Sequence, residues 1–522
     1  MVCPVVKIDS NITGLSIAEE ECLKVLPDLV PDSGAQDGAV WYGQEPNNYT
    51  DFGSTISTVA RQPIDPSRQN KKGTVTTVDA NGGFNTDVTK NNILRQMQGF
   101  MFADAREKFS TLPLNAAQVA INSVAASSKT YAATTGLLAL NVPGSLILAE
   151  DFGMISNNGL KTVVSATASG VVVSETLADE ALPPQFARLT KVGHQFVAGD
   201  VVGTVVGGRL ILTATAGTFN TFDLTLGEWV YLGGDASSTR LGANFGYARI
   251  SSIAAKTLSF DDTTFTPVAA AGSGISLRIF FGTVIRNEKL PSLIKRRTYQ
   301  LERTLGTTSD GDVQAEYLIG AVSNQFTLNI PNSDKLTADF AFIALDSDYR
   351  NGSVADPLKL GTHMAAMGEA AINTSSDLFR FKVAIHSAGS NPEGLFGFAS
   401  DGSIAIDNGA TPLKALANLG AIDTATGNFN VTGSVTAYFQ TVEAVKAVRE
   451  NADVGVSAIF AADNSGQIFD IPLVGLGNGR PQVELNQPIM LPLDMNGAEC
   501  ANGYTMLYNH FAYLPDVAMP DV

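Results

Sequence analysis

The hydrophobic residues alternate with polar ones over much of the chain, most clearly between Asn324 and Asp346. In NQFTLNI, Phe326, Leu328 and Ile330 occupy every second position, and a turn follows at Pro331. The run LTADFAFI then alternates again, and its apolar positions are Leu336, Ala338, Phe340 and Phe342. A period of two is typical of strands that bury one face. The stretch therefore predicts a hairpin of two half-buried strands.

Strand-like alternation changes to a helical period at two places. Within Thr74–Ala105 an alternating run leads into one helical face formed by Ile93, Leu94, Met97, Phe100 and Met101. Thr89 is the expected N-cap of this helix. Within Gly427–Asn451 a similar run leads into the helical stripe Val442, Val445 and Val448. A strand followed by a helix thus occurs twice.

Two further repeats point to duplication. Asn157–Ser174 resembles Asn244–Asp261, with Gly159 aligned to Gly246, and each copy predicts a strand, a tight turn and another strand. The hairpin also has a weaker twin, because Tyr317–Ile330 resembles Leu473–Asn486. In the twin, Val483 and Leu485 alternate like a strand before Pro488, and a further strand is expected after it.

These repeats predict a mainly β protein with two tandem β-sandwich or barrel domains, each with one α-helix, and an inserted small all-β module. We expect the first domain at residues 1–136 and 286–350. We expect the inserted module, facing outward, at 137–285, and the second domain at 351–522. A chain of 522 residues is too long for one ordinary core, which agrees with several domains.

Composition narrows the possible functions. Only 16 % of residues are charged, so Ser, Thr, Asn and Gly must cover much of the surface, or neighbouring molecules must. The net charge of −17 argues against a tight grip on nucleic acid, which needs Lys and Arg. It is compatible with a surface along which DNA slides, and equally with solubility alone.

The cysteines and the apolar stretches give no sign of a secreted or membrane protein. Cys3, Cys22 and Cys500 are few and odd in number, so no disulfide framework is expected. The start MVCPVVKIDSN lacks the apolar core of a signal peptide, and GLLALNVPGSLILA is too interrupted to span a membrane.

The sequence contains only weak candidates for a catalytic, metal-binding or phosphate-binding site. The four histidines, His194, His363, His386 and His510, match no metal-binding or catalytic spacing. The carboxylates of Ser309–Glu316 and Asp346–Gly352 fit solvated loops better than a calcium site. Gly475–Arg480 is better explained as a turn than as a phosphate loop. We therefore expect no enzyme activity, no catalytic, cofactor-binding or metal-binding residue, and no cofactor.

The only basic cluster is Ile294–Arg297. A nucleic-acid-binding surface would require a broader basic stripe with aromatic residues. We favour charge pairing with acidic residues, either between strands or between subunits, over a solvated strand end.

The stretches GEWVYLGG, GYARISSIAAKTLSFD, RIFFGTVIRN, RRTYQLERTL and NQFTLNIPNSDKLTADFAFI follow one another in an order that resembles the major tail tube proteins of long-tailed, non-contractile bacteriophages. NVTGSVTAYFQTVEAVKAV is similar to the second half of the same family. The resemblance runs from about Leu137 to Leu514, and more loosely over Val40–Ala105. Among these phages, the flagellum-attaching, Chi-like group is the most similar. The link NEKLPSLIKRRTY is longer than this family leads us to expect.

The resemblance implies a structural virion protein with two tube folds per chain. Three chains would form a ring with pseudo-sixfold symmetry, and the rings would stack into the hollow tail tube that conducts phage DNA into the host bacterium. The implied partners are other copies of the chain, the tape-measure protein, the tail terminator and tip proteins, and double-stranded DNA in passage. No membrane binding is implied. The implied location is the phage tail, after assembly in the bacterial cytoplasm.

Within this assembly the second face of the hairpin is the candidate site. Asp339, Ala341 and Ile343 lie on that mixed face and are expected at a subunit contact or at the lumen. A bulky charge at Ala341 would then be expected to block ring formation. Two other functions remain open: an adhesin, which would want an exposed aromatic patch, and a depolymerase, which would want paired carboxylates in a cleft.

Overall fold

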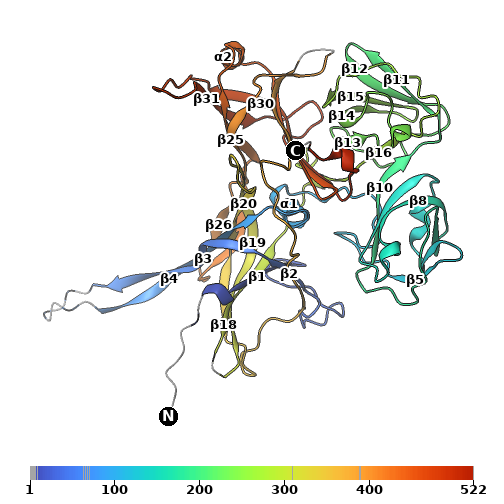
Figure 1. Ribbon diagram of the computed structural model, residues 1–522. Coiled ribbons are helices and arrows are strands. Elements are labelled where there is room, and N and C mark those ends of the chain that lie inside the picture. Colours follow the sequence, from blue (N-terminus) through green and yellow to red (C-terminus); the bar gives the residue numbers. More distant parts are fainter. Residues whose placement is uncertain are drawn as a thin grey trace. The chain divides into compact units, whose positions relative to one another are not determined.

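The computed structural model describes residues 8, 10–62, 64, 66, 69, 71–308, 310–386 and 390–520. The fold is mainly β, as predicted, and α-helix in this part of the chain is confined to α1 (Leu94–Phe100) and α2 (Glu443–Arg449) (Figure 1). Apolar residues alternate along several strands, such as Thr337–Ala344, which bury one face, whereas Val454–Ala462 and Leu507–Phe511 are buried at nearly every position.

Two series of strands repeat one arrangement. The first series comprises β1 (Gly14–Glu19), β2 (Val40–Gln44), β3 (Pro46–Arg61), β4 (Lys71–Asp87), α1, β18 (Tyr299–Thr307), β19 (Val313–Ile330), β20 (Thr337–Ala344) and β21 (Asp346–Arg350). The second comprises β23 (Leu378–Ile385), β24 (Glu393–Gly394), β25 (Ala399–Asp407), β28 (Asn430–Tyr438), α2, β29 (Val454–Ala462), β30 (Ser465–Asn478), β31 (Met490–Gly497) and β32 (Leu507–Phe511). We call these the first and the second repeat.

The strand pairings of the two repeats correspond one to one. In the first repeat the pairs are β1–β2, β1–β18, β18–β19, β19–β20, β19–β21, β3–β4 and β4–β20. In the second they are β23–β24, β23–β29, β29–β30, β30–β31, β30–β32, β25–β28 and β28–β31. The tandem duplication predicted from the sequence is therefore present in the topology.

The segment between α1 and β18 contains a second duplication. Its first copy comprises β5 (Ile121–Ala125), β6 (Thr130–Ala133), β7 (Ser145–Glu150), β8 (Gly159–Ala166), β9 (Gly170–Val173) and β10 (Arg188–Gln195). Its second copy comprises β11 (Val201–Val206), β12 (Arg209–Ala214), β13 (Trp229–Leu232), β14 (Gly246–Ile253), β15 (Thr257–Thr263) and β16 (Arg278–Phe280). The predicted repeat corresponds to the hairpins β8–β9 and β14–β15.

Both six-stranded copies use the same order of pairs. The order is β5–β6–β9–β8–β7–β10 in the first copy and β11–β12–β15–β14–β13–β16 in the second. The last strands of the two copies, β10 and β16, pair with each other and join both copies into one twelve-stranded sheet. Each copy has its own core, one around Tyr131 and the other around Phe219 and Phe222.

Four short strands complete the described part of the chain: β17 (Thr283–Arg286), β22 (Thr362–Met364), β26 (Thr411–Lys414) and β27 (Ala421–Ala425). β17 pairs with β32, β22 runs parallel to β2, and β26 and β27 form a separate hairpin.

The chain folds into two compact units. One contains residues 1–102, 294–372 and 401–434, and the other contains residues 103–293, 373–400 and 435–522. Such units reflect packing density, whereas the boundaries expected from the sequence concern the repeats, so those boundaries stay a prediction. Most of β25 and the β26–β27 hairpin pack within the first unit, although β25 belongs to the second repeat.

Three local predictions were wrong. Ile93, without a side-chain cap, is the N-cap of α1, and Thr89 instead bonds to Glu369. In α2 the buried positions are Ala444 and Ala447 instead of the valine stripe, because the helix begins only at Glu443 and is two turns long. The third error concerns β30, which ends at Asn478, so Val483 and Leu485 lie outside any strand.

Candidate functional site

One sheet of the first unit has an apolar face and a mainly polar one. Its strands lie in the order β3, β4, β20, β19 and β25, all antiparallel. The predicted hairpin β19–β20 is at its centre, and the predicted inward residues Phe326, Leu328, Phe340 and Phe342 are buried. The alternation read from the sequence therefore identified the core face correctly.

Aromatic packing fixes the apolar face. The ring of Phe340 lies 5.0 Å from that of Phe84 on β4 and 5.4 Å from that of Phe326 on β19. Phe100 of α1 covers these rings at 5.5 Å from Phe340 and 5.4 Å from Phe342. Fully buried aromatic clusters of this kind make a rigid support. The opposite face is therefore held in one geometry.

Asp339 is at the centre of that opposite face, which we call the polar face. Its carboxylate accepts a hydrogen bond from Asn85 Nδ2 at 2.8 Å and another from Asn329 Nδ2 at 2.7 Å. These bonds cross from β20 to β4 on one side and to β19 on the other. The carboxylate is exposed and needs no counter-ion to be satisfied.

The rest of the polar face continues this pattern of amides, hydroxyls and carboxylates. Asn47 Nδ2 bonds to Asp87 at 2.6 Å, and Lys335 in the β19–β20 turn bonds to Asp87 at 2.8 Å. At the other edge, Gln325 bonds to Asp407 at 3.3 Å, and the hydroxyls of Ser403 and Ser434 lie 2.9 Å apart. The face is thus polar and mildly acidic, and its side chains bond mainly to one another.

Two of the three predicted site residues are less exposed than the third. Asp339 is exposed, whereas Ala341 and Ile343 are half-buried on the same face. Both edges of β20 are occupied, by β4 and by β19. Any contact with another molecule at these residues must therefore use the polar face and not the strand edge.

The second repeat places a carboxylate on the corresponding face. In β31, which corresponds to β20, Leu491, Leu493 and Met495 are buried and Asp494 between them is exposed. Both repeats therefore combine an apolar inner face with an acidic outer position on the equivalent strand.

The outer part of the β3–β4 hairpin is a long two-stranded ribbon (Figure 1). It carries exposed aliphatic side chains, with Ile56 58 %, Val59 62 % and Val75 44 % exposed. Its end is basic, with Arg61 paired to Lys71 in the register. A two-stranded ribbon alone is marginally stable in water, so this one is suited to packing against another surface.

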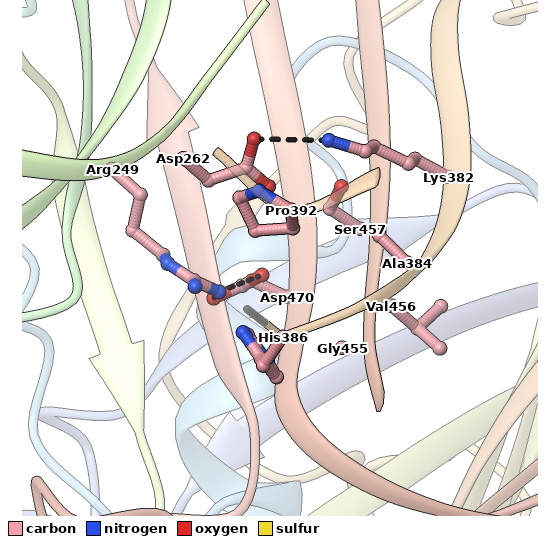
Figure 2. A pocket seen from close by; sticks show the side chains of 10 residues that line it. All are labelled: Arg249, Asp262, Lys382, Ala384, His386, Pro392, Gly455, Val456, Ser457 and Asp470. Carbon is pink, nitrogen blue, oxygen red and sulfur yellow. Dashed lines mark hydrogen bonds and ion pairs between the residues drawn. The ribbon is translucent and has the colours of Figure 1, made fainter. Parts of the chain in front are cut away.

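The other conspicuous site is a small polar pocket in the second unit (Figure 2). Arg249 on β14 contacts Asp261 at 2.8 Å and Asp470 on β30 at 3.3 Å. Asp262 on β15 contacts Arg380 and Lys382 of β23, each at 3.3 Å. The pocket holds about 10 Å³ of free space, and these ion pairs tie the inserted strands to the second repeat.

Two carboxylates in this cluster titrate differently. Complete burial raises the pKa of Asp470 to about 6, although Arg249 partly offsets the effect. Burial alone would also raise the pKa of Asp262, but Arg380, Lys382 and Arg249 outweigh it and lower the pKa. The cluster is therefore best understood as internal ion pairing, since its charges are matched to one another.

The predicted weak sites are occupied by ordinary structural contacts. His363 bonds to Glu302 at 2.9 Å, His386 to the Pro472 carbonyl at 2.6 Å, and His194 packs between Phe196 and Phe222. His510 is buried in β32, and Glu316 pairs with Arg303. The expectations of solvated loops and of a turn were wrong for part of these stretches, because Glu316 lies in β19, Asp346–Arg350 forms β21 and Gly475–Asn478 belongs to β30. Among the described residues no cluster of His, Cys, Asp and Glu could hold a metal ion.

The basic cluster pairs with acidic residues, as predicted. Arg296 contacts Asp423 at 2.8 Å and Arg297 contacts Glu19 at 3.1 Å. These are contacts within the chain, from the segment before β18 to Asp423 on β27 and Glu19 on β1. Cys22 and Cys500 are free thiols, and Cys3 lies outside the described residues. No helix in the described ranges is long and apolar enough to cross a membrane.

Comparison with protein families decides the assignment. The phage tail tube protein family matches residues 10–497, which include the first repeat, the inserted strands and the second repeat as far as β31. The chain belongs to the phage tail tube protein family. It is therefore a structural component of a phage tail. No curated protein matches this tail tube protein.

Sequence reasoning found the polar face of this tail tube protein only in part. It identified Asp339, Ala341 and Ile343, and the alternation of the hairpin also places Asn329 on the polar side. Asn85 and Asp407 were not singled out, although alternation in their strands would have placed them on the same side. The ion cluster around Asp470 gave no local signal, because its members come from strands far apart in the sequence.

Proposed function

We propose that this chain assembles into stacked rings that form the hollow tube of a long-tailed, non-contractile phage and conduct its DNA. Membership of the tail tube family is the single observation that carries the proposal. In this role the chain is a structural protein of the virion and not an enzyme. The Chi-like subgroup is part of the proposal and rests on sequence resemblance alone.

The duplicated topology supports a ring of three chains. Each chain carries the same set of strand pairings twice. Three such chains would present six similar units around an axis. Head-to-tail contacts between identical chains produce closed rings when the rotation closes. We therefore propose a trimer with pseudo-sixfold symmetry.

The polar face supports a role at the lumen. The centre of a protein interface is usually rich in apolar and aromatic side chains. This face instead carries Asn, Asp, Ser and Gln side chains that already bond to one another. Carboxylates at Asp87, Asp339 and Asp407 would repel DNA phosphates and keep the duplex from adhering to the wall. We therefore assign Asp339, Ala341 and Ile343 to the lumen instead of a subunit contact.

The inserted strands and the partners belong to the same proposal. Inserted modules suit the outside of a tube, since the inside must stay open for DNA. In the virion the tube would surround a tape-measure protein, end at terminator and tip proteins, and form in the bacterial cytoplasm.

Negative-stain electron microscopy of the purified chain tests this proposal. Rings with sixfold appearance that stack into hollow tubes are the expected result, and mass measurement of single rings should give three chains. A protein that stays monomeric at high concentration under every salt condition would overturn the proposal.

A further inference from the structure

One strand pairing joins the two repeats and has no counterpart among the described residues. Every pairing inside the first repeat recurs inside the second, but β19 of the first repeat also pairs with β25 of the second. The register runs from Gln325 opposite Asp407 to Ile330 opposite Gly402. By the correspondence of the repeats, β30 should pair in the same way with a strand equivalent to β25. In the first repeat that strand is β3.

The stretch of the second repeat that would receive this partner is left open. Gln482 bridges to Met490 on β31 much as Asn329 pairs with Thr337 on β20. On this correspondence Val483 takes the place of Ile330. Ile330 is 5 % exposed beside β25, whereas Val483 is 74 % exposed. All residues from Arg480 to Ile489 are exposed.

The backbone of this stretch also has unused bonding groups. Gln482 directs both its N–H and its C=O to Met490. In an extended strand the next residue points its groups to the opposite edge, so the N–H of Val483 would point away from β31. In the described part of the chain that N–H has no partner. Pro481 faces the same edge and has no N–H, so a partner strand there could bond to its carbonyl but would find its first donor at Val483.

The donor strand is available at the other end of the same chain. Among the described residues β3 has register partners only in β4, so its second edge is open to another strand. β25, its counterpart, uses both edges, one against β28 and the other against β19. The open edge of β3 and the open stretch after β30 are therefore complementary. Within one chain the equivalent pairing is made only once, between β19 and β25.

We propose that β3 of one copy adds as an antiparallel strand to residues 478–483 of the next copy. The intrachain junction β19–β25 is the template for this interchain junction. Strand addition supplies main-chain hydrogen bonds, and alternate side chains give the register. A head-to-tail junction of this kind continues from chain to chain until the ring closes. This inference rests on the proposed tube function and names the segments that join its subunits.

The neighbouring hairpin gives a second, independent indication. β26 and β27 follow β25 and pack on the base of β4, where Lys414 contacts Asp79 at 2.6 Å and the Leu419 carbonyl accepts a bond from the Val78 N–H at 3.0 Å. The corresponding extension in the first repeat is the outer β3–β4 ribbon, whose Ile56 and Val59 remain exposed. The ribbon would therefore pack on the second repeat of the next copy as β26–β27 packs on the first repeat of its own.

A local feature explains why the receiving stretch is not a strand before assembly. Asn478 and Gly479 both have positive φ, +61° and +72°, and turn the chain at the end of β30. Asn and Gly adopt such values at low cost and leave them as easily. The stretch is thus held in a turn that a partner strand can straighten.

Substitution of Val483 tests the backbone bond directly. Val483→Pro removes the N–H that would bond to β3, and Val483→Thr is the matched control that keeps the N–H and the β-branched shape. Both substitutions replace an exposed side chain outside any strand, so the circular dichroism spectrum and the thermal unfolding of the monomer should be unchanged. We expect Val483→Thr to form tubes and Val483→Pro to lose them, with a rise of at least tenfold in the concentration needed for assembly.

Cysteine cross-linking gives a second measurement that does not depend on the proline variant. Val483→Cys is combined in turn with Asn48→Cys, Tyr49→Cys or Thr50→Cys, which cover both faces of β3. At least one pair should give disulfide-linked dimers and trimers after mild oxidation, and Val483→Cys alone should not.

The outcomes separate the two proposals. If the unmodified chain forms no rings, the tube function itself is overturned. If it forms tubes but Val483→Pro assembles normally and no pair cross-links, the strand addition is wrong and the tube function stands. If Val483→Thr loses assembly as fully as Val483→Pro, the side chain and not the backbone makes the contact, which also overturns strand addition.

Discussion

β19 and β30 occupy equivalent places in the two repeats, yet one is longer than the other. β19 runs from Val313 to Ile330, whereas β30 runs from Ser465 and ends at Asn478. Both are followed by stretches that alternate in sequence, NQFTLNI in one and PQVELN in the other. The difference is the partner on the second edge. β25 flanks that edge at the end of β19, whereas in the described part of the chain the end of β30 has a strand partner only on its other edge, where β31 pairs with it. Strand length here is set by tertiary contact more than by local sequence.

The largest difference in stability is expected between a strand end with partners on both edges and a stretch with one open edge. Leu328 is fully buried between β20 and β25, so Leu328→Ala should lower the free energy of unfolding by about 2–5 kcal/mol. Val483→Ala should change it by less than about 0.5 kcal/mol, because the side chain is already exposed. Urea unfolding of the monomers measures both. Similar losses in the two variants would mean that the two ends are equally packed.

The second prediction uses a position where the repeats differ in chemistry. Asp470 lies in β30 within the ion cluster, whereas the matching part of β19 carries the buried Tyr317 and Leu318. Because the folded pKa of Asp470 is raised from 3.8 to about 6, its ionised form costs stability above pH 6. This cost disappears as the pH falls through 6 toward 4.

Asp470→Asn should therefore leave stability at pH 7.5 unchanged or raise it, by at most about 3 kcal/mol, and should flatten the pH dependence between 7.5 and 5. Thermal unfolding across this range is the measurement. Asp262→Asn is the matched control, since its lowered pKa makes the ionised form stabilising, and it should destabilise at pH 7.5. A loss at pH 7.5 for Asp470→Asn as large as for Asp262→Asn would contradict this account of the cluster.

The third prediction concerns the ribbon, which is long in the first repeat and replaced by β26–β27 in the second. Ile56→Asp combined with Val59→Asp should leave monomer unfolding within about 0.5 kcal/mol, because both side chains are exposed. It should weaken tube formation, which light scattering follows. Ile56→Thr with Val59→Thr is the control that keeps β-branched residues. Normal assembly of the charged variant would exclude the ribbon from the contact.

The smallest effect is expected at the polar face. Ala341→Arg in β20 and Asp494→Arg in β31 would each add a cation at equivalent faces. If both faces line the lumen, rings and tubes should form normally, and the variant tubes should retain DNA in a manner that high salt reverses. Nuclease protection of DNA mixed with tubes provides the measurement. If Ala341→Arg fails to form rings, Ala341 lies at a contact between subunits and not at the lumen.

Much of the fold could be predicted from the sequence, because alternation reports burial directly. Phe326, Leu328 and Phe340 were assigned to the core by period alone, and the duplications were visible as matched strings. The errors lie where neighbours decide the outcome. Val483 has the residue type of a strand but lacks the partner, and the Val442 stripe gave way to Ala444 because α2 begins later than its pattern suggests.

The candidate site was predictable only as one face of one strand. Asp339 stood out because a carboxylate in an alternating run must point away from the core. Its partner Asn329 lies in the other strand of the predicted hairpin, but Asn85 comes from β4, whose place beside β20 the sequence does not reveal. The proposed junction between copies could not be predicted from the sequence, because it follows only from comparing the strand pairings of the two repeats.

Hydrogen exchange at the Val483 amide tests the central claim most directly. In the free chain this exposed N–H should exchange within seconds, while the amides of the buried end of β19, such as that of Leu328, should be protected. In assembled tubes the account predicts that Val483 becomes protected to a similar degree. A Val483 amide that still exchanges at the free rate in well-formed tubes would show that β3 does not add to this stretch.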